Sequence, residues 1–268
     1  DYYAHPRVCR LKMRELYPQL ELPVPECDDP KPRPEEQADQ SKGRWGDSYR
    51  DHWQQAEASQ RFSSLDDMLR FSPLAHPDFS HWHVVEDADY SSEEIIYQRY
   101  RARYPAAWGD HAPAGSPAHV FFYNTMFMWP MLVFGYENFL MLCLEPAFER
   151  IMDEFAEINR RVFRAFARLP VNFVICHDDI VLSNGPVCSP QWMHRYIFPR
   201  YEELWSIVKA AGKEVIFMVD GCVDAFVDDV MACGARGIIS EPYTDYKAIA
   251  RRYKDCFIAG EGDNRVDR

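Results

Sequence analysis

Five short apolar runs alternate with amphipathic segments in the second half of the sequence, and this alternation limits the fold more than any other feature. The runs are HVFFY (119–123), NFVICH (172–177), EVIFMV (214–219), RGIIS (236–240) and CFIAG (256–260). They are almost continuously apolar, as strands buried on both faces must be. Between the first two runs, the segment 146–169 places its apolar residues at helical spacing. Strand, helix and strand, repeated with short connections, predict a parallel sheet with right-handed crossovers.

Such a sheet is either doubly wound or closed into a barrel. A doubly wound nucleotide-binding sheet carries a glycine-rich phosphate turn, and the sequence contains neither G-x-G-x-x-G nor a Walker motif. The pattern therefore favours a (β/α)8 TIM-type barrel in a single structural domain, with the last barrel strand absent from this chain. Residues 115–268 are expected to form barrel strands and helices. The polar, proline-rich residues 1–114 are expected to cover the barrel and to supply its first strands.

The connection between the second and third runs carries helix boundary signals. Ser189 is a suitable N-cap, and Pro190 suits the first helical position. Pro199 predicts a break in the middle of the segment, and Gly212 predicts its end. We therefore expect two helical pieces between 190 and 211.

The composition excludes two classes of partner. Lys and Arg number 30 against 42 Asp and Glu, so the formal net charge is -12. An acidic surface repels nucleic acids and anionic membranes. No apolar run is long enough for a membrane span, no signal pattern begins the sequence, and the eight cysteines contain no C-x-x-C pair. We therefore expect a cytoplasmic protein whose partners are small molecules or other proteins, including other copies of the chain.

Polar residues follow each apolar run, at the positions where barrel enzymes build their active sites. A histidine with adjacent carboxylates can transfer protons or ligate a metal. The candidate catalytic residues are His177, Asp178, Asp179 and Asp220. The candidate substrate-binding residues are Tyr123, Asn124, Trp129, Asn184, Met218, Glu241, Glu261 and Asp263. A metal site would use His177, Asp220 and Glu241.

Each of these candidates also has a purely structural alternative. Asp178 or Asp179 can accept hydrogen bonds from loop amides, and Asp220 or Glu241 can cap the helix that follows it. Trp129 and its methionine neighbours are also typical of a core. The sequence alone leaves these alternatives open.

Several motifs together resemble the uroporphyrinogen decarboxylase superfamily. They are GRWGDSY (43–49), FFYNTMFMWPMLVFGYENFLMLCLEP (121–146), the segment from HDDIVLSNGPVCSP to GIISEP (177–242) and DCFIAGEGD (255–263). Each is individually weak, and their order and spacing over residues 45 to 263 carry the resemblance. The resemblance implies a barrel with its site at the carboxyl ends of the strands.

The superfamily contains two chemistries. One is porphyrinogen decarboxylation, and the other is methyl transfer between a methyl donor and cobalamin carried on a separate corrinoid protein. An acidic rim repels a polycarboxylate, so the resemblance implies the corrinoid-dependent methyltransferase branch, with an O- or N-methyl donor and demethylase activity. The alternatives are a decarboxylase or lyase acting on a small carboxylated substrate, and a non-catalytic barrel that binds a metabolite.

The thiol-using members of the methyltransferase branch bind zinc through an H-x-C-G turn. The matching positions here are Met218, Val219, Asp220 and Gly221. A thioether is a poor zinc ligand. The resemblance therefore implies that zinc or another divalent metal could bind here, but without the usual His and Cys ligands.

Overall fold

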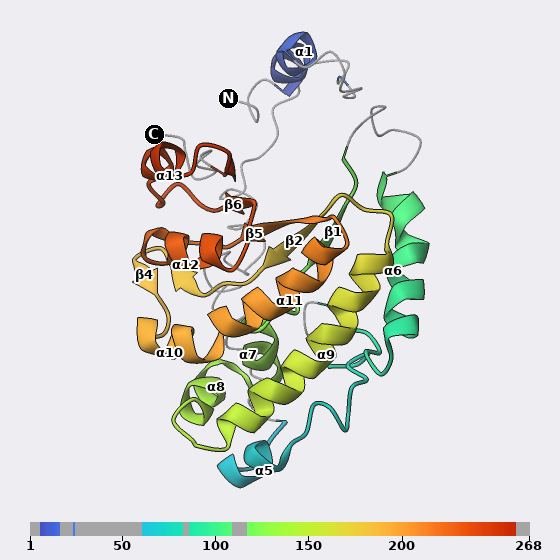
Figure 1. Ribbon diagram of the computed structural model, residues 1–268, viewed down its shortest axis with the longest axis vertical. Helices are drawn as coiled ribbons and strands as arrows, with labels where there is room; N and C mark the ends of the chain where they lie inside the picture. The colour runs from blue at the N-terminus through green and yellow to red at the C-terminus, as the bar shows by residue number, and fades with distance from the viewer. Residues whose placement is uncertain (1–5, 17–23, 25–60, 83–85, 109–116, 261–268) are drawn as a thin grey trace.

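A computed structural model describes residues 6–16, 24, 61–82, 86–108 and 117–260. Its main sheet contains β1 (His119–Phe122), β2 (Phe173–His177), β5 (Glu214–Met218), β6 (Gly237–Ile239) and β7 (Phe257–Ala259). All neighbouring pairs are parallel, and the order across the sheet is β1-β2-β5-β6-β7 (Figure 1). Each strand lies inside one of the five apolar runs. The mixed α/β fold with a parallel sheet is therefore confirmed.

The helices between these strands follow the signals in the sequence. They are α9 (Phe148–Arg168), α10 (Pro190–Tyr196), α11 (Phe198–Ala210), the 3-10 helix η1 (Asp224–Phe226), α12 (Val227–Ala232) and α13 (Tyr246–Arg252). The Ser189 side chain accepts a hydrogen bond from the amide of Trp192, as the N-cap prediction requires. The two helices α10 and α11 meet at Ile197, and Pro199 lies in the first turn of α11, where proline is tolerated.

The earlier part of the chain contributes helices. They are α1 (Pro6–Leu16), α5 (Leu65–Arg70) and α6 (Glu93–Trp108), while α7 (Met128–Phe134) and α8 (Tyr136–Leu142) lie between β1 and α9. Among the described residues before 117, the β-structure is one antiparallel bridge between Asp78 and Asp89. Arg168 of α9 forms ion pairs with Glu93 and Glu94 of α6. The motif GRWGDSY lies outside the described residues, and the supply of barrel strands by residues 1–114 stays a prediction.

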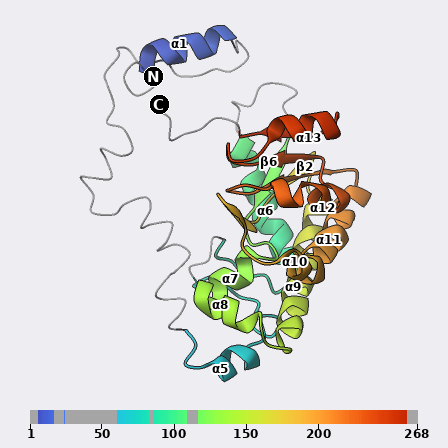
Figure 2. The same cartoon turned by 90° about the vertical axis from the view of Figure 1, so that its left-hand side faces the viewer.

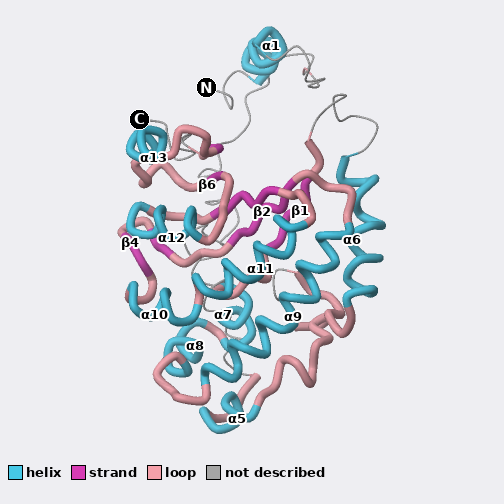
Figure 3. The backbone as a smooth tube through the Cα atoms, in the orientation of Figure 1, coloured by secondary structure: helices cyan, strands magenta, loops and turns pink. Residues whose placement is uncertain are grey.

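The two sides of the sheet have different surroundings. Successive residues of a strand point to opposite sides, so each side is lined by every second residue. One side, the helix-covered side, packs against α9 and α11, which lie side by side in Figures 2 and 3. On it, Phe122 packs against Phe166 of α9 with ring centroids 5.4 Å apart, and Phe217 packs against Tyr201 of α11 at 5.8 Å. The residues of this side are fully or almost fully buried: Val120, Phe122, Val174, Cys176, Val215, Phe217 and Ile238.

The opposite side of the sheet, here called the second side, is apolar as well. The strand register aligns one row of its residues as Phe121, Ile175, Ile216, Gly237 and Phe257, and the next row as His177, Met218, Ile239 and Ala259. Phe257 is 52% exposed, in contrast to the residues of the helix-covered side. A sheet with two apolar sides explains the continuous apolar runs of the sequence.

The described strands form an open sheet, in which β1 and β7 are the two edges. They therefore do not complete the eight-stranded barrel, which stays a prediction. A short antiparallel hairpin of β3 (Val181–Leu182) and β4 (Gly185–Pro186) follows β2. None of the described helices is both long enough and apolar enough to span a bilayer.

Candidate active site

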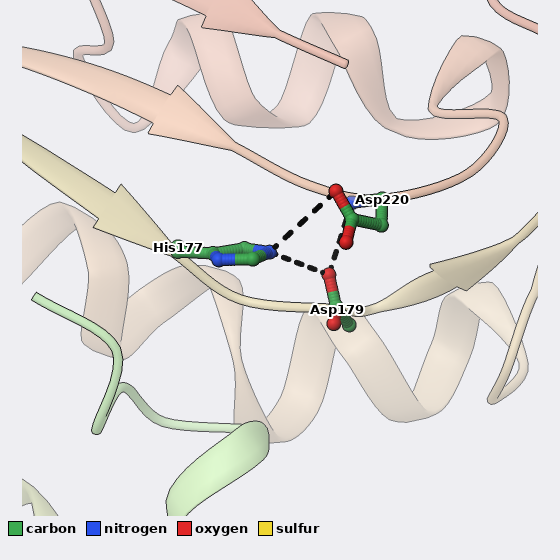
Figure 4. Close-up of side chains that lie close together, drawn as sticks. All are labelled: His177, Asp179 and Asp220. Carbon is green, nitrogen blue, oxygen red and sulfur yellow. Dashed lines mark hydrogen bonds and ion pairs between the residues drawn. The ribbon is translucent and has the colours of Figure 1, made fainter. Parts of the chain in front are cut away.

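His177, Asp179 and Asp220 converge at the carboxyl ends of β2 and β5 (Figure 4). The imidazole Nε2 of His177 lies 2.9 Å from Oδ1 of Asp179 and 3.9 Å from Oδ1 of Asp220. Oδ1 of Asp179 also accepts a hydrogen bond of 2.9 Å from the backbone amide of Asp220. The side chains come from two neighbouring strand ends and point toward one another.

Strand alternation explains why these three residues meet. His177 is the last residue of β2 and pairs with Met218, the last residue of β5. Asp179 lies two residues beyond His177, and Asp220 lies two residues beyond Met218. Because side chains alternate with a period of two, all of them point to the second side of the sheet. Residues next to them in sequence point to the helix-covered side.

The turn that carries Asp220 is held from both sides. Gly221 has a positive φ of 116°, and a Cβ atom there would lie 2.7 Å from the backbone carbonyl of Leu182. The amide of Cys222 donates to the Leu182 carbonyl at 2.9 Å, which ties the turn to the β3–β4 hairpin. On its other side, the Ser240 hydroxyl donates to the Gly221 carbonyl at 2.8 Å. Only glycine permits both the backbone conformation and this close approach.

Burial and charge act in opposite directions on His177. The His177 and Asp179 side chains are 7% and 3% exposed, whereas the Asp220 side chain is 34% exposed. Burial by itself lowers the pKa of His177, but the hydrogen bond that the ring donates to Asp179 and the charges of Asp179, Asp220 and Asp178 outweigh it, so the pKa lies above its usual value. Nδ1 of the ring is buried and has no hydrogen-bond partner among the described residues. The polar contacts of the ring are therefore made through Nε2.

Tyr123 lies at the edge of this cluster. Its ring centroid is 4.7 Å from that of His177 and 4.5 Å from that of Phe121. Its amide donates to Oε1 of Glu86 at 3.1 Å, which fixes the backbone at the end of β1. Burial raises the pKa of the Tyr123 hydroxyl, and the charges of Asp220 and Asp179 add to this effect. The structure therefore places Tyr123 beside His177, and its role in substrate binding stays a prediction.

Asp178 does not join the cluster, although it lies between two of its members. Its carboxylate is fully buried and accepts hydrogen bonds from the amides of Phe127 at 2.9 Å and Met128 at 2.6 Å. The Tyr201 hydroxyl of α11 donates to it at 2.5 Å. Burial raises the pKa of Asp178 to about 6. These contacts hold the start of α7 against α11, so the catalytic role predicted for Asp178 gives way to its structural alternative.

Two of the predicted substrate-binding residues belong to the core. The Asn124 amide is buried and donates from Nδ2 to the Glu86 carbonyl at 3.0 Å and to the Tyr90 hydroxyl at 3.1 Å. Trp129 is fully buried, with its ring centroid 4.6 Å from that of Tyr90 and 5.1 Å from that of Phe79. Neither side chain is available to a substrate, so these two predictions are corrected.

The remaining predicted residues lie in different places. Met218 is half-buried beside His177 on the second side. Asn184 is exposed in the turn between β3 and β4. The backbone carbonyl of Glu241 accepts from the Tyr246 hydroxyl at 3.2 Å, and in the structure Asp179 takes the place that the sequence gave to Glu241 beside His177 and Asp220. Glu261 and Asp263 lie outside the described residues.

Four residues that the sequence analysis did not single out support the site. Glu86 holds the end of β1 and binds Arg99 of α6 at 3.0 Å. Tyr201 binds Asp178, while Ser240 and Thr244 hold the Gly221 turn through their hydroxyl groups. The available signal for Ser240 was its place as the hydroxyl residue that ends the run RGIIS (236–240). Glu86 belongs to an irregular segment and carried no such signal.

The residues do not fit the zinc site that the resemblance implies. Met218 stands where the H-x-C-G turn has its histidine, and its thioether is a poor zinc ligand. Within the described part of the chain, the group with metal-ligating atoms close together consists of His177, Asp179 and Asp220, whose candidate atoms lie within 4.8 Å of one another. This set offers one nitrogen and carboxylate oxygens instead of nitrogen and sulfur.

No protein-family model matches this sequence, and no curated protein matches it. Among solved structures, the chain is similar to a methyltransferase from Methanosarcina mazei, with 13% sequence identity and a TM-score of 0.42. The similarity covers 54% of this chain and 40% of that methyltransferase, so the matched region spans less than half of the other protein. The functional inference therefore depends on the site itself.

Proposed function

We propose that this chain is a methyltransferase that takes a methyl group from a small O- or N-methyl donor and passes it to a corrinoid carried on a separate protein. The observation that carries the proposal is the convergence of His177, Asp179 and Asp220 at the carboxyl ends of two parallel strands. Ligands of parallel α/β proteins bind at this end of the sheet. The sequence resemblance to the corrinoid-linked branch supplies the reaction class.

We also propose that the five strands belong to a (β/α)8 barrel. Their spatial order follows their order in the chain, as in a barrel, whereas a doubly wound sheet reverses direction at a switch point. The second side of the sheet presents rows of apolar residues topped by His177 and Met218, as the inner surface of a barrel does. Both features support the barrel, and in such a barrel the candidate site would lie at the mouth.

Removal of a methyl group from oxygen or nitrogen needs assistance at the leaving atom. The methyl group departs without its bonding electrons, so the electron pair stays on the oxygen or nitrogen of the donor. His177 suits the role of proton donor, because its pKa lies above the usual value and keeps more of the ring protonated near neutrality. The corrinoid, when present on its carrier, supplies the nucleophile that accepts the methyl group.

The other two residues of the cluster have different roles in the proposed reaction. Asp179 is buried and holds the His177 ring through Nε2, so it fixes the orientation of the proton donor. Asp220 is the most exposed of the three, so the donor's leaving atom approaches from its side. Tyr123, beside the His177 ring, offers an aromatic face to the methyl donor.

The direct test mixes the purified protein with a corrinoid protein whose cobalt has been reduced to Co(I), and adds candidate methyl donors one at a time. An O- or N-methyl donor that is a substrate changes the corrinoid absorption spectrum and releases the demethylated product. Asp220→Asn should abolish the change while the protein stays folded. Asp229→Asn is the control, because Asp229 also faces a histidine, with its Oδ1 2.9 Å from Nε2 of His194, but on the surface.

A different result would overturn the proposal. If no methyl donor changes the corrinoid spectrum and a carboxylated compound instead loses carbon dioxide in a reaction that depends on His177, the protein is a decarboxylase. The same residue would then protonate the carbon left behind.

A further inference from the structure

We propose that His177, Asp179 and Asp220 bind one divalent transition-metal ion. The site differs from the zinc site implied by the resemblance, because its imidazole comes from β2 and its other donors are carboxylates. It concerns the same cluster as the proposed function, yet metal binding can be measured whether or not the protein transfers a methyl group.

The spacing of the donor atoms suits such an ion. For bonds of about 2.1 Å, ligand atoms around a metal lie about 3.0 Å apart in octahedral geometry and about 3.4 Å apart in tetrahedral geometry. The observed separations from Nε2 of His177 are 2.9 Å to Asp179 and 3.9 Å to Asp220. The first separation is slightly shorter and the second slightly longer than these ligand–ligand distances. Side-chain shifts of less than about 1 Å would complete the three-ligand set.

The donor types select the class of metal. One imidazole with carboxylate oxygens suits zinc, iron, cobalt or manganese, whereas magnesium and calcium prefer oxygen ligands alone. No thiolate contributes, so ions that demand sulfur are disfavoured. We therefore expect Zn²⁺ and Co²⁺ to bind and Mg²⁺ to compete poorly.

The site is rigid on one side and accessible on the other. His177 and Asp179 are more than nine-tenths buried, and the Asp220 amide locks the position of the Asp179 carboxylate. Asp220 is one-third exposed and leaves a route for the ion. Three protein ligands also leave coordination positions for water or a substrate atom, which is the arrangement of a catalytic metal site.

The pair of His194 and Asp229 provides an internal comparison. Its Nε2 and Oδ1 atoms are also 2.9 Å apart, but the side chains are 55% and 32% exposed, and no third ligand belongs to the group among the described residues. Two exposed ligands bind an ion weakly, so this pair is a suitable control for adventitious binding.

In the proposed reaction, the ion would take the place of the proton shared by His177 and Asp179 and would stabilise the electron pair left on the donor. This step rests on the proposed function. The binding of the ion does not.

The experiment measures the binding of Co²⁺ and Zn²⁺ to protein that has been freed of metal with a chelator. Calorimetry should show that one equivalent of Zn²⁺ binds per chain. Co²⁺ should bind with the same stoichiometry and should be displaced by Zn²⁺, because both ions occupy the same site. The Co²⁺ absorption spectrum should lack the intense thiolate band that any of the cysteines would produce. Asp220→Asn should weaken the affinity at least tenfold while circular dichroism stays unchanged, and His194→Ala should leave both the affinity and the stoichiometry unchanged.

Three results would overturn the site. They are the absence of stoichiometric binding to the wild type, a thiolate band in the Co²⁺ spectrum, and an affinity that Asp220→Asn does not alter. If methyl transfer proceeds at its full rate in metal-free protein, the ion has no part in the reaction, while the binding site and the proposed function both stand. If the ion binds as expected and no methyl donor reacts, the function fails and the site stands.

Discussion

Asp178 and Asp179 both follow β2, but they point to opposite sides of the sheet and have different roles. On the helix-covered side, Asp178 is enclosed by backbone amides and the Tyr201 hydroxyl. On the second side, Asp179 contacts His177 and lies beside the partly exposed Asp220. The difference shows that the residue type does not decide the role of a strand-end acid. Its direction relative to the helix layer does.

The largest expected effect falls on the second side. Asp220→Asn should lower kcat/KM for methyl transfer on the order of 1,000-fold, because the amide cannot hold the positive charge of the site. Its stability should change little, since Asp220 is partly exposed. Initial rates and a thermal melt of the same preparation measure both quantities. A large loss of stability would mean that Asp220 belongs to the structural group with Asp178.

The next effect falls on the helix-covered side. Asp178→Ala should lower the free energy of unfolding by about 3 kcal/mol, because two amides and a hydroxyl lose their buried acceptor. Denaturant titration measures this change. If the variant keeps its stability but loses activity, Asp178 is a site residue after all.

Substitutions of glycine can distinguish two contributions to stability: the positive φ of the Gly221 turn and its close contact with Leu182. Gly221→Ala should cost about 2 to 3 kcal/mol, because it combines a strained positive φ with a Cβ atom 2.7 Å from the Leu182 backbone. Gly185→Ala is the matched control, with a φ of 127° and nothing within 4 Å of the new Cβ. Its cost should be about 1 kcal/mol, from the backbone conformation alone. Equal costs would show that the contact with Leu182 is unimportant.

The smallest effect is expected for the exposed histidine. His194→Ala should change the free energy of unfolding by less than about 0.5 kcal/mol, because a solvent-exposed ion pair contributes little to stability. Thermal melts of the variant and the wild type measure the difference. A change comparable to that of Asp178→Ala would show that the surface pair has a structural role.

Much of this arrangement could be predicted from the sequence. The five apolar runs contain the five strands, the Ser189 N-cap is formed, and the break between α10 and α11 lies near Pro199. The period of two along a strand also predicts that His177 and Asp179 share one side while Asp178 faces the other. These features are local, so nearby residues are enough to determine them.

Which side faces the helices could not be predicted, because both sides of the sheet are apolar and the pattern has no polar face. Which of Asp178 and Asp179 belongs to the candidate site therefore depends on how α7 and α11 pack against the sheet, and the sequence does not reveal this packing. Trp129 and Asn124 were misplaced for the same reason, since their burial depends on Tyr90, a residue more than 30 positions away in the chain. Asp179 replaced Glu241 as the partner of His177 because the hydrogen bond from the Asp220 amide fixes it there.

The most direct test of the account is the rate of corrinoid methylation by Asp179→Asn relative to the wild type, measured while both proteins are folded. The asparagine oxygen can still accept the Asp220 amide, so the fold should persist. The rate should be at least about 100-fold lower, because the amide of the asparagine cannot hold His177 in its protonated or metal-bound form. A variant that transfers methyl groups at the wild-type rate would contradict the assignment of this cluster as the active site.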